Sequence, residues 1–329
     1  MNLVLYHGAC SDGFASAFLF HLYFKTMGLE HELRAVNYKE PLPTGLDNID
    51  VYIVDFCYSP QDTKTLAKTA KSITVLDHHL TAAENYGGYG IHVRNYGGCV
   101  VNLEICEEES GASLVLKYLR RFEHEKSQFE FLHNPRIEKL ISAVRDYDLW
   151  YHEFDDTHIY HELLQIVPRT MEGWEKTFLK DSDEDFKNLL DVAGYYYDAS
   201  KLLAEQFASQ HQMINICGHK VPVVNSPHVF ADRVCERLNQ THPFAISFVV
   251  NSQHLYCSLR SKRGYGVDVS EIARQFGGGG HATSSGFKIH PSNLPKLLSG
   301  KLTPKPCLAE RILDNIIKFL EYIRFNCCK

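Results

Sequence analysis

The stretch VLDHHLTA, residues 75–82, ends an apolar run with one carboxylate and two adjacent imidazoles. The run that begins at residue 73 has the composition of a buried strand, so Asp77, His78 and His79 stand where that strand ends. One interpretation is a polar strand end that meets solvent. The other is a group of metal ligands and phosphate-binding side chains at the edge of a sheet. The surrounding sequence decides between them.

Two further apolar runs have the same character, at residues 2–6 and 51–56. Helical patterns alternate with the runs or follow them, at residues 12–28, 59–72, 110–122 and 136–150. Continuous apolar strands that alternate with helices are typical of a parallel sheet covered on both faces. The sequence therefore predicts an α/β fold with a doubly wound parallel sheet in its N-terminal domain.

The pattern changes in the second half of the chain. A long helical segment at 183–212 is polar on one side and could bridge two domains. Beyond it, strands are expected at 219–226, 244–251 and 255–261, and helices at 268–276 and 308–325. The predicted organisation is an N-terminal domain over 1–185, a helical linker over 186–212 and a smaller mixed α/β domain over 213–329. Residues 151–180 have no interpretation beyond an insertion near a cleft.

Composition limits the class of protein. The 329 residues carry a formal net charge of −6, with 44% hydrophobic and 22% charged residues, which is an ordinary globular composition. A protein that coats a nucleic-acid duplex would usually be basic. The ten cysteines include no Cys-x-x-Cys pair, so a thiolate zinc site is not expected. With neither a signal peptide nor an apolar span of membrane length, we expect a cytoplasmic location and no membrane partner.

Polar residues follow each of the three apolar runs of the first domain. His7, Asp55 and the Asp77-His78-His79 triplet come directly after them, and Asp12 begins the first helix. In an open α/β sheet the carboxyl ends of the strands form the ligand site. One such residue alone is more often a helix cap or turn former, but several together are hard to explain as caps.

Mixed carboxylate and imidazole ligands favour Mn²⁺. Asp55, central among the strand ends, is the candidate for a ligand shared by two ions about 3.5–4 Å apart. A fourth acidic ligand could come from RDYDLW (145–150), where Asp146 and Asp148 are the alternatives. For either residue alone, a solvated helix end is the simpler interpretation.

A glycine run interrupts the second domain in DVSEIARQFGGGGHATSSGF, residues 268–287. Such a run could be a flexible linker, but a capped helix precedes it and HATSSGF follows it. The sharper interpretation is a backbone cradle for an anion, with His281 nearby. Alternation in LYCSLRS (255–261) places Arg260 on a polar face, where its guanidinium could bind phosphate or simply lie at the surface.

In this order, the segments resemble the DHH phosphoesterase superfamily with its associated C-terminal domain, nearest its nanoRNase and single-strand exonuclease branch. The resemblance rests on YHGACSDGF (6–14), VDF (54–56), LDHH (76–79), RDYDLW (145–150) and FGGGGHATSSGF (276–287), and it spans nearly the whole chain. It implies a hydrolase of phosphoester bonds that uses one or two Mn²⁺ ions, with Mg²⁺ as the other possibility.

The resemblance also implies a role for each matching residue. One metal would be held by His7 and Asp55, and a second by Asp12, Asp55, His78 and Asp146. His79 would contact the scissile phosphate, and Asp77 would orient the neighbouring imidazoles. The groups expected to hold another phosphate or the terminal nucleotide of the substrate are Arg260, Gly278, Gly279, Gly280 and His281.

One departure concerns the first motif, which usually has aspartates four and six residues after its histidine. Here Asp12 lies five residues after His7, and Cys10 stands near the missing first aspartate. This sequence is closer to a variant of that motif that begins His-Gly-x-Cys-x-Asp-Gly. The first metal site is therefore weaker, lost, or completed by Cys10 or water.

These features predict a metal-dependent phosphodiesterase that acts on short single-stranded oligonucleotides. The same site could serve 3′-phosphoadenosine phosphate or a cyclic dinucleotide. A different class, a degenerate protein that binds nucleotides without hydrolysing them, is supported only by Cys10. Candidates for stacking on a base are Tyr256, Tyr265 and Phe287, each more often a core or surface residue. The oligomeric state is not predicted.

Overall fold

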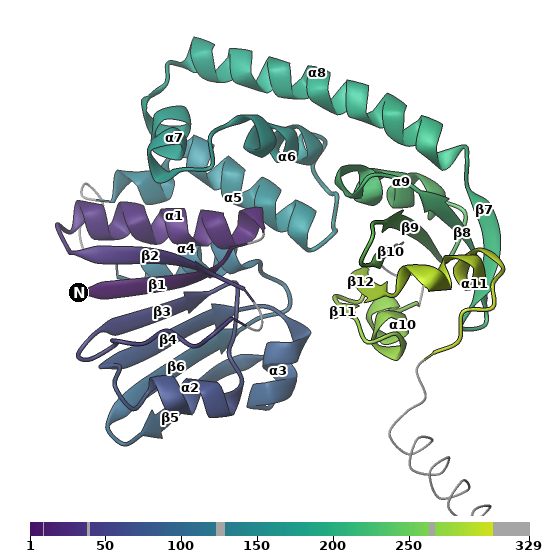
Figure 1. Ribbon diagram of the computed structural model, residues 1–329. Coiled ribbons are helices and arrows are strands. Elements are labelled where there is room, and N and C mark those ends of the chain that lie inside the picture. The colour runs from purple at the N-terminus through teal and green to yellow at the C-terminus, as the bar shows by residue number, and fades with distance from the viewer. Residues whose placement is uncertain (9, 38–39, 123–128, 263–266, 305–329) are drawn as a thin grey trace, which may run out of the picture. The chain divides into compact units, whose positions relative to one another are not determined.

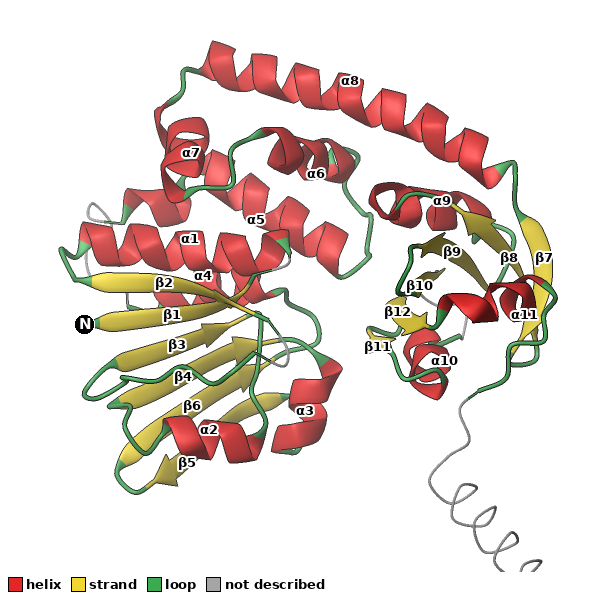
Figure 2. Cartoon of the chain, viewed as in Figure 1, coloured by secondary structure: helices red, strands yellow, loops and turns green. Residues whose placement is uncertain are grey.

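The computed structural model describes residues 1–8, 10–37, 40–122, 129–262 and 267–304 (Figures 1 and 2). It divides into two compact units, residues 1–199 and 200–329. The division falls within helix α8, Asp183–Ala208, inside the predicted linker. The helix expected at 308–325 and the stacking candidate Tyr265 lie outside the described residues.

The first unit is built on a six-stranded sheet in the order β2-β1-β3-β4-β6-β5. Its strands are β1 (Asn2–His7), β2 (His31–Val36), β3 (Asp50–Val54), β4 (Ser72–Asp77), β5 (Gly90–Tyr96) and β6 (Cys99–Ile105). All neighbours pair in parallel except β5 and β6. The predicted parallel sheet is confirmed, and the hairpin at its edge is an addition. Gly97 and Gly98 form the hairpin turn with φ of 65° and 103°, as a two-residue turn of this kind requires.

Helices cover both faces of this sheet (Figure 1). One face carries α1 (Ser11–Thr26), α4 (Gly111–Arg120) and α5 (Pro135–Asp148), and the other carries α2 (Pro60–Leu66) and α3 (Leu80–Tyr86). Successive strand residues supply opposite cores, because side chains alternate along a strand. Val54 packs under the first group of helices and Ile53 under the second. The doubly wound prediction is therefore confirmed.

The uninterpreted stretch 151–180 folds as α6 (Thr157–Ile166), α7 (Met171–Glu175) and a π-helical turn (Lys176–Lys180). A short 3₁₀ turn, Glu130–His133, precedes α5. Trp174 of α7 is 1% exposed and lies edge-on to Phe14 and Phe18 of α1, with ring centroids 4.8 and 5.4 Å apart. This contact anchors the segment to the helix that follows β1.

The second unit has its own six-stranded sheet, in the order β11-β12-β10-β9-β8-β7. Its strands are β7 (Gln212–Ile216), β8 (His219–Asn225), β9 (Phe244–Val250), β10 (Leu255–Ser261), β11 (Gly279–Gly280) and β12 (Ser284–Ile289). Only β8 and β9 pair in parallel. The helical segments are η4 (His228–Phe230), α9 (Ala231–Leu238), α10 (Val269–Gln275), η5 (Pro291–Asn293) and α11 (Leu294–Leu298). The predicted smaller mixed α/β unit is confirmed.

Helix α8 contributes to both cores. Phe186 and Ala193 pack into the first unit, and Ala204 and Ala208 pack into the second. Across the described ranges, no helix combines the length and apolar character needed to cross a membrane.

Candidate metal centre

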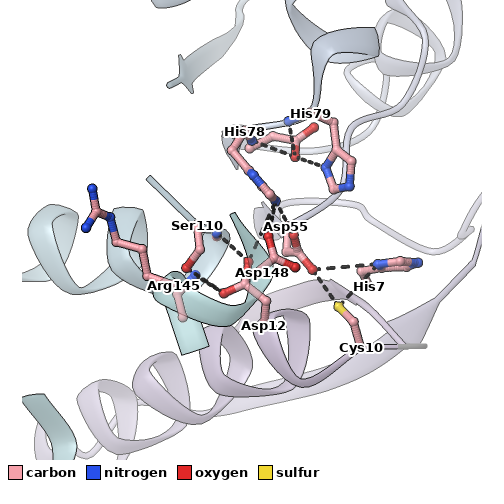
Figure 3. Close-up of polar contacts among 12 residues, drawn as sticks. His7, Cys10, Asp12, Asp55, His78, His79, Ser110, Arg145 and Asp148 are labelled. Atoms are coloured by element: carbon pink, nitrogen blue, oxygen red, sulfur yellow. Dashed lines mark hydrogen bonds and ion pairs between the residues drawn. The ribbon is translucent and has the colours of Figure 1, made fainter. Parts of the chain in front are cut away.

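Three adjacent strands bring their polar ends together in the first unit (Figure 3). His7 ends β1, Asp55 follows β3, and Asp77 ends β4 and is followed by His78 and His79. Because β1, β3 and β4 are parallel neighbours, their carboxyl ends share one edge of the sheet. The predicted strand-end cluster is present.

Asp55 divides its two carboxylate oxygens between two groups of side chains. Oδ2 accepts a hydrogen bond from the Cys10 thiol at 2.8 Å and lies 3.6 Å from His7 Nδ1. Oδ1 lies 3.1 Å from His78 Nε2. Asp55 is 1% exposed and has a left-handed backbone, with φ of 53°. Such a conformation is costly for a non-glycine residue and tends to occur at functional sites.

Asp12 is held by the first turn of α4. Its carboxylate accepts hydrogen bonds from Ser110 Oγ at 2.8 Å, Gly111 N at 2.6 Å and Ala112 N at 2.9 Å. Asp12 Oδ2 also lies 3.8 Å from His78 Nε2. Oriented backbone N–H groups at a helix start hold a carboxylate in place and favour its charged form. The strand-to-helix junction after β6 therefore positions a residue that follows β1.

The structure brings Asp148, rather than the predicted Asp146, to this cluster. Asp148 Oδ2 lies 3.4 Å from His78 Nε2. Asp146 instead accepts hydrogen bonds from Glu153 N at 2.9 Å, from Phe154 N at 3.4 Å and from the Thr157 hydroxyl. Residues two positions apart on an α-helix are rotated by about 200° about its axis, so the two carboxylates face opposite ways.

Asp77 fixes the orientation of His79, as predicted for a supporting carboxylate. Asp77 Oδ1 accepts hydrogen bonds from His79 Nδ1 at 2.7 Å and from the backbone N–H of His78 at 2.8 Å. Asp77 is fully buried, whereas the His79 side chain is 18% exposed. The bond directs the Nδ1–H of His79 at Asp77 and sets the plane of the ring.

The carboxylates crowd one another in a buried space. Burial, reinforced by Asp55 and Asp148, raises the pKa of Asp12 well above its usual range, and burial raises that of Asp148. Burial alone would lower the pKa of His78, but Asp148, Asp55 and Asp12 raise it to about 10. One imidazolium therefore faces crowded carboxyl groups, and a bound cation would favour the ionised forms of Asp12 and Asp148 that burial and crowding disfavour.

The donor set fits divalent cations. Three groups of described residues within the first unit have ligand atoms within 4.8 Å of one another: His7–Cys10–Asp55, Asp12–His78–Asp148 and Asp55–Asp77–His78–His79. In addition, Asp148 Oδ2 is buried and accepts no hydrogen bond from the described residues. A buried carboxylate oxygen without a donor is the kind of atom that a metal ion satisfies. The predicted residues His7, Asp12, Asp55 and His78 all belong to these groups.

The substrate-binding residues predicted in the second unit have structural partners of their own. The Arg260 guanidinium forms an ion pair with Asp232, at 2.8 Å from Nε and 2.5 Å from Nη2, and also donates to Ser285 O. A Cβ on Gly278 would lie 2.0 Å from Gly286 O, so this glycine allows close approach to β12. Gly279 and Gly280 form β11, and His281 N donates to Ser284 O at 2.8 Å. Their roles toward substrate remain predictions.

Sequence reasoning did not identify Ser110 and Gly111. A Cβ on Gly111 would lie 2.5 Å from Asp55 Cβ and 3.0 Å from Asp12 Oδ2. Only glycine fits where the start of α4 passes these two carboxylates. The signal in the sequence was the Ser-Gly pair at the start of the helical pattern 110–122.

The fold and this cluster define a class: two-unit α/β proteins with a DHH centre at the strand ends of the first unit. In the second unit, residues 228–300 match the family described as the DHHA1 domain. This match supports the resemblance of the chain to the DHH phosphoesterase superfamily.

Individual relatives are distant. An uncharacterised protein of Acanthamoeba polyphaga mimivirus is 27% identical over 308 residues, which cover 87% of this chain and 67% of that protein. RecJ from Thermus thermophilus, solved with Mn²⁺, has the same fold, with a TM-score of 0.51, 15% identity and coverage of 89% of this chain and 50% of RecJ. The pGpG-specific phosphodiesterase PggH of Vibrio cholerae gives a TM-score of 0.47 at 14% identity, covering 90% of this chain and 95% of PggH.

Proposed function

We propose that the protein is a metal-dependent phosphodiesterase that hydrolyses phosphoester bonds of short single-stranded oligonucleotides. One observation carries the proposal: Asp55 turns Oδ2 toward His7 and Cys10 and Oδ1 toward His78. A carboxylate placed between two ligand groups is the arrangement that two-metal phosphoryl chemistry uses. The oligonucleotide substrate is supported by the DHHA1 match and by the exonuclease RecJ, whose fold the chain shares.

The two ligand groups follow from the contacts. His7, Asp55 and Cys10 would hold one ion, and the second would be held by Asp12, Asp55, His78 and Asp148. We expect Mn²⁺, which suits mixed carboxylate and imidazole ligands and which is bound to RecJ. When bound, such ions neutralise charge on the phosphoryl group and make a water nucleophile available near neutral pH.

His79 supplies the chain's own contribution to catalysis. Burial works to lower the pKa of His79, but Asp77 and the hydrogen bond to it raise that pKa above its usual value. The ring therefore carries a second proton more readily than an ordinary histidine near neutral pH. Held by Asp77, it would donate to a non-bridging phosphoryl oxygen and stabilise the charge that develops there.

The charge of the chain favours a small substrate. With a formal net charge of −6, the protein offers little general attraction for a long polyanion. Binding energy must then come from a few local contacts, which suits an oligonucleotide of a few residues.

The test uses the purified full chain with MnCl₂, with MgCl₂ and with EDTA. A labelled dinucleotide, a longer single strand, 3′-phosphoadenosine phosphate and a cyclic dinucleotide are offered side by side. His78→Ala removes a residue shared by two of the ligand groups. His92→Ala is the matched control, because the His92 ring, on the edge strand β5, forms a hydrogen bond with the backbone oxygen of Gly88.

We expect metal-dependent cleavage of the dinucleotide in the parent protein and in His92→Ala, and none in His78→Ala. If the protein prefers one of the other three compounds, the proposal of a metal-dependent phosphoesterase stands and the proposed substrate changes. Folded protein that binds Mn²⁺ but cleaves none of the four would contradict the proposal and favour a nucleotide-binding protein.

A further inference from the structure

Arg169 lies beside the loop that carries Cys10, in the segment between α6 and α7. Its guanidinium carbon is 5.4 Å from the centroid of the Phe14 ring, and its Nη2 donates to the backbone oxygen of Cys10. The residue is exposed, and its Nε and Nη1 make no hydrogen bond within the described part of the chain. Two of its donor positions are therefore available to a ligand.

The loop that bears Arg169 is held firmly. Thr170 Oγ1 accepts from Gly173 N at 3.0 Å and caps α7, and Thr170 N donates to Pro168 O at 2.8 Å. A Cβ on Gly173 would lie 2.6 Å from Pro168 O, so this turn is closely packed. One turn further on, Trp174 is buried against Phe14. Phe14 thus contacts both Trp174, which anchors the loop, and the exposed Arg169. The Arg169 side chain is therefore held in place without a ligand.

Cys10 connects this arginine to the candidate metal centre. The Cys10 carbonyl accepts from Arg169, while its thiol donates to Asp55 Oδ2 at 2.8 Å and lies 3.4 Å from His7 Nδ1. Arg169 therefore contacts the His7–Cys10–Asp55 group through the backbone of Cys10. An arginine that binds the backbone of a metal-binding loop, and forms no ion pair with the carboxylates there, is placed to meet an anion that also approaches the metal.

The charges of the centre point the same way. Among the described residues, the carboxylates of Asp12, Asp55, Asp77 and Asp148 form ion pairs with histidines and with no lysine or arginine. A phosphate that enters such a site needs further positive charge, beyond that of the metals, on its outward side. Arg169 is a cation that the structure holds at the His7–Cys10 side.

We propose that Arg169 binds a non-bridging phosphate oxygen of the substrate on the His7–Cys10–Asp55 side of the centre. The inference rests on the proposed function, because it adds a substrate-binding residue to that same site. It assigns a role to the segment 151–180, for which the sequence alone offered no function.

The test measures binding of AMP and of adenosine to the Mn²⁺-loaded full chain by calorimetry. The variants are Arg169→Gln, Arg169→Lys and, as the matched control, Arg94→Gln. Arg94 is also exposed and also donates to backbone oxygens, those of Val93 and Tyr86. Mn²⁺ affinity is measured separately for each protein by electron paramagnetic resonance.

We expect Arg169→Gln to bind AMP about 10- to 100-fold more weakly, the usual range for a lost charged hydrogen bond. Arg169→Lys keeps the charge without the planar fork and falls in between. Arg94→Gln binds AMP as the parent does, and adenosine binding and Mn²⁺ affinity are the same in all four proteins.

Three results would overturn the inference. These are unchanged AMP affinity in Arg169→Gln, a parallel loss of Mn²⁺ affinity that reveals only support of the Cys10 loop, and no AMP binding by the metal-loaded parent. Dinucleotide hydrolysis by the same preparations separates the two proposals. Arg169-dependent AMP binding without hydrolysis refutes the proposed function and keeps the inference. If the protein hydrolyses the dinucleotide, and Arg169→Gln changes neither kcat/KM nor AMP affinity, the inference is refuted and the proposed function stands.

Discussion

Asp146 and Asp148, two residues apart at the end of α5, point their carboxylates at different partners. Asp148 Oδ2 lies 3.4 Å from His78 Nε2 in the candidate metal centre. Asp146 is 1% exposed and accepts hydrogen bonds from the loop that leads to α6, at Glu153 N and Phe154 N, and from Thr157. One residue is placed for chemistry, and the other ties the end of α5 to the next helix.

Substitution of these two aspartates by asparagine separates the roles. Asp148→Asn should lower Mn²⁺ affinity and phosphodiesterase activity by about 100-fold or more. The loss of a residue that only orients a metal ligand usually costs about 10- to 100-fold. Asp146→Asn places an amide NH₂ among hydrogen-bond donors and should cost about 1–3 kcal/mol of the free energy of unfolding. Mn²⁺ titration and urea unfolding of both variants check this. The reverse pattern would restore Asp146 as the ligand.

Gly111→Ala should disrupt the centre from outside the ligand set. The added Cβ would lie 2.5 Å from Asp55 Cβ, so Asp55 or the start of α4 must shift. Because a misplacement of about 1 Å can cost 100-fold in rate, we expect a loss of that order in kcat. Gly194→Ala in α8 is the control, since its Cβ meets nothing within 4 Å. Equal activity of the two variants would show that the start of α4 yields without moving Asp55.

Cys10 should act as a ligand when a thiophilic metal is supplied. Burial, reinforced by Asp55, Asp12 and Asp148, raises the pKa of the Cys10 thiol well above its usual range, so the thiol is protonated without metal. Cd²⁺ should displace that proton and produce an ultraviolet thiolate-to-metal band. Cys10→Ser should lose the band, and Cys57→Ser should retain it. A band that survives in Cys10→Ser would exclude this residue from the metal site.

Glu175 should make stability depend on pH in the acid range. Burial acts to raise the pKa of Glu175, but hydrogen bonds from Lys25, Lys180 and His21 outweigh burial and lower that pKa to about 2. A carboxyl with a lowered folded-state pKa stabilises the protein above its ordinary pKa, and this stabilisation is lost as pH falls toward 2. Glu175→Gln should therefore cost about 1–2 kcal/mol at pH 7, since both lysines are half exposed.

The difference between parent and Glu175→Gln should shrink as the pH falls from about 4.5 toward 2, as measured by unfolding at several pH values. Glu172→Gln, at an exposed position in the same helix, serves as the control and should match the parent throughout. A constant difference between parent and Glu175→Gln at every pH would mean that packing, not charge, accounts for the effect.

Strands β1, β3 and β4 could be predicted from the sequence because both of their faces are buried, whereas β6 was not predicted. Residues 51–54 and 73–77 read as continuous apolar runs, and their polar ends mark the centre. The edge strands β2 and β5 were not predicted, because solvent reaches them and the apolar pattern fades. In the second unit, β12 escaped notice because SSGFKI is mostly small and polar.

Contacts between distant segments could not be predicted from the sequence. Whether Asp146 or Asp148 faces His78 depends on the rotation of α5, which tertiary packing sets. The pairing of Arg260 with Asp232 joins residues 28 positions apart. Likewise, no local pattern relates Arg169 to Cys10, which lies 159 residues earlier.

The hydrogen bonds between Asp12 and the start of α4 have a consequence for folding during synthesis. They join residues 98 to 100 positions apart, and Asp148 comes later still. A ribosome must therefore release nearly half the chain before the centre can assemble. Metal capture then marks the completion of the first unit, and an ion that binds only the folded state stabilises the newly made protein by mass action.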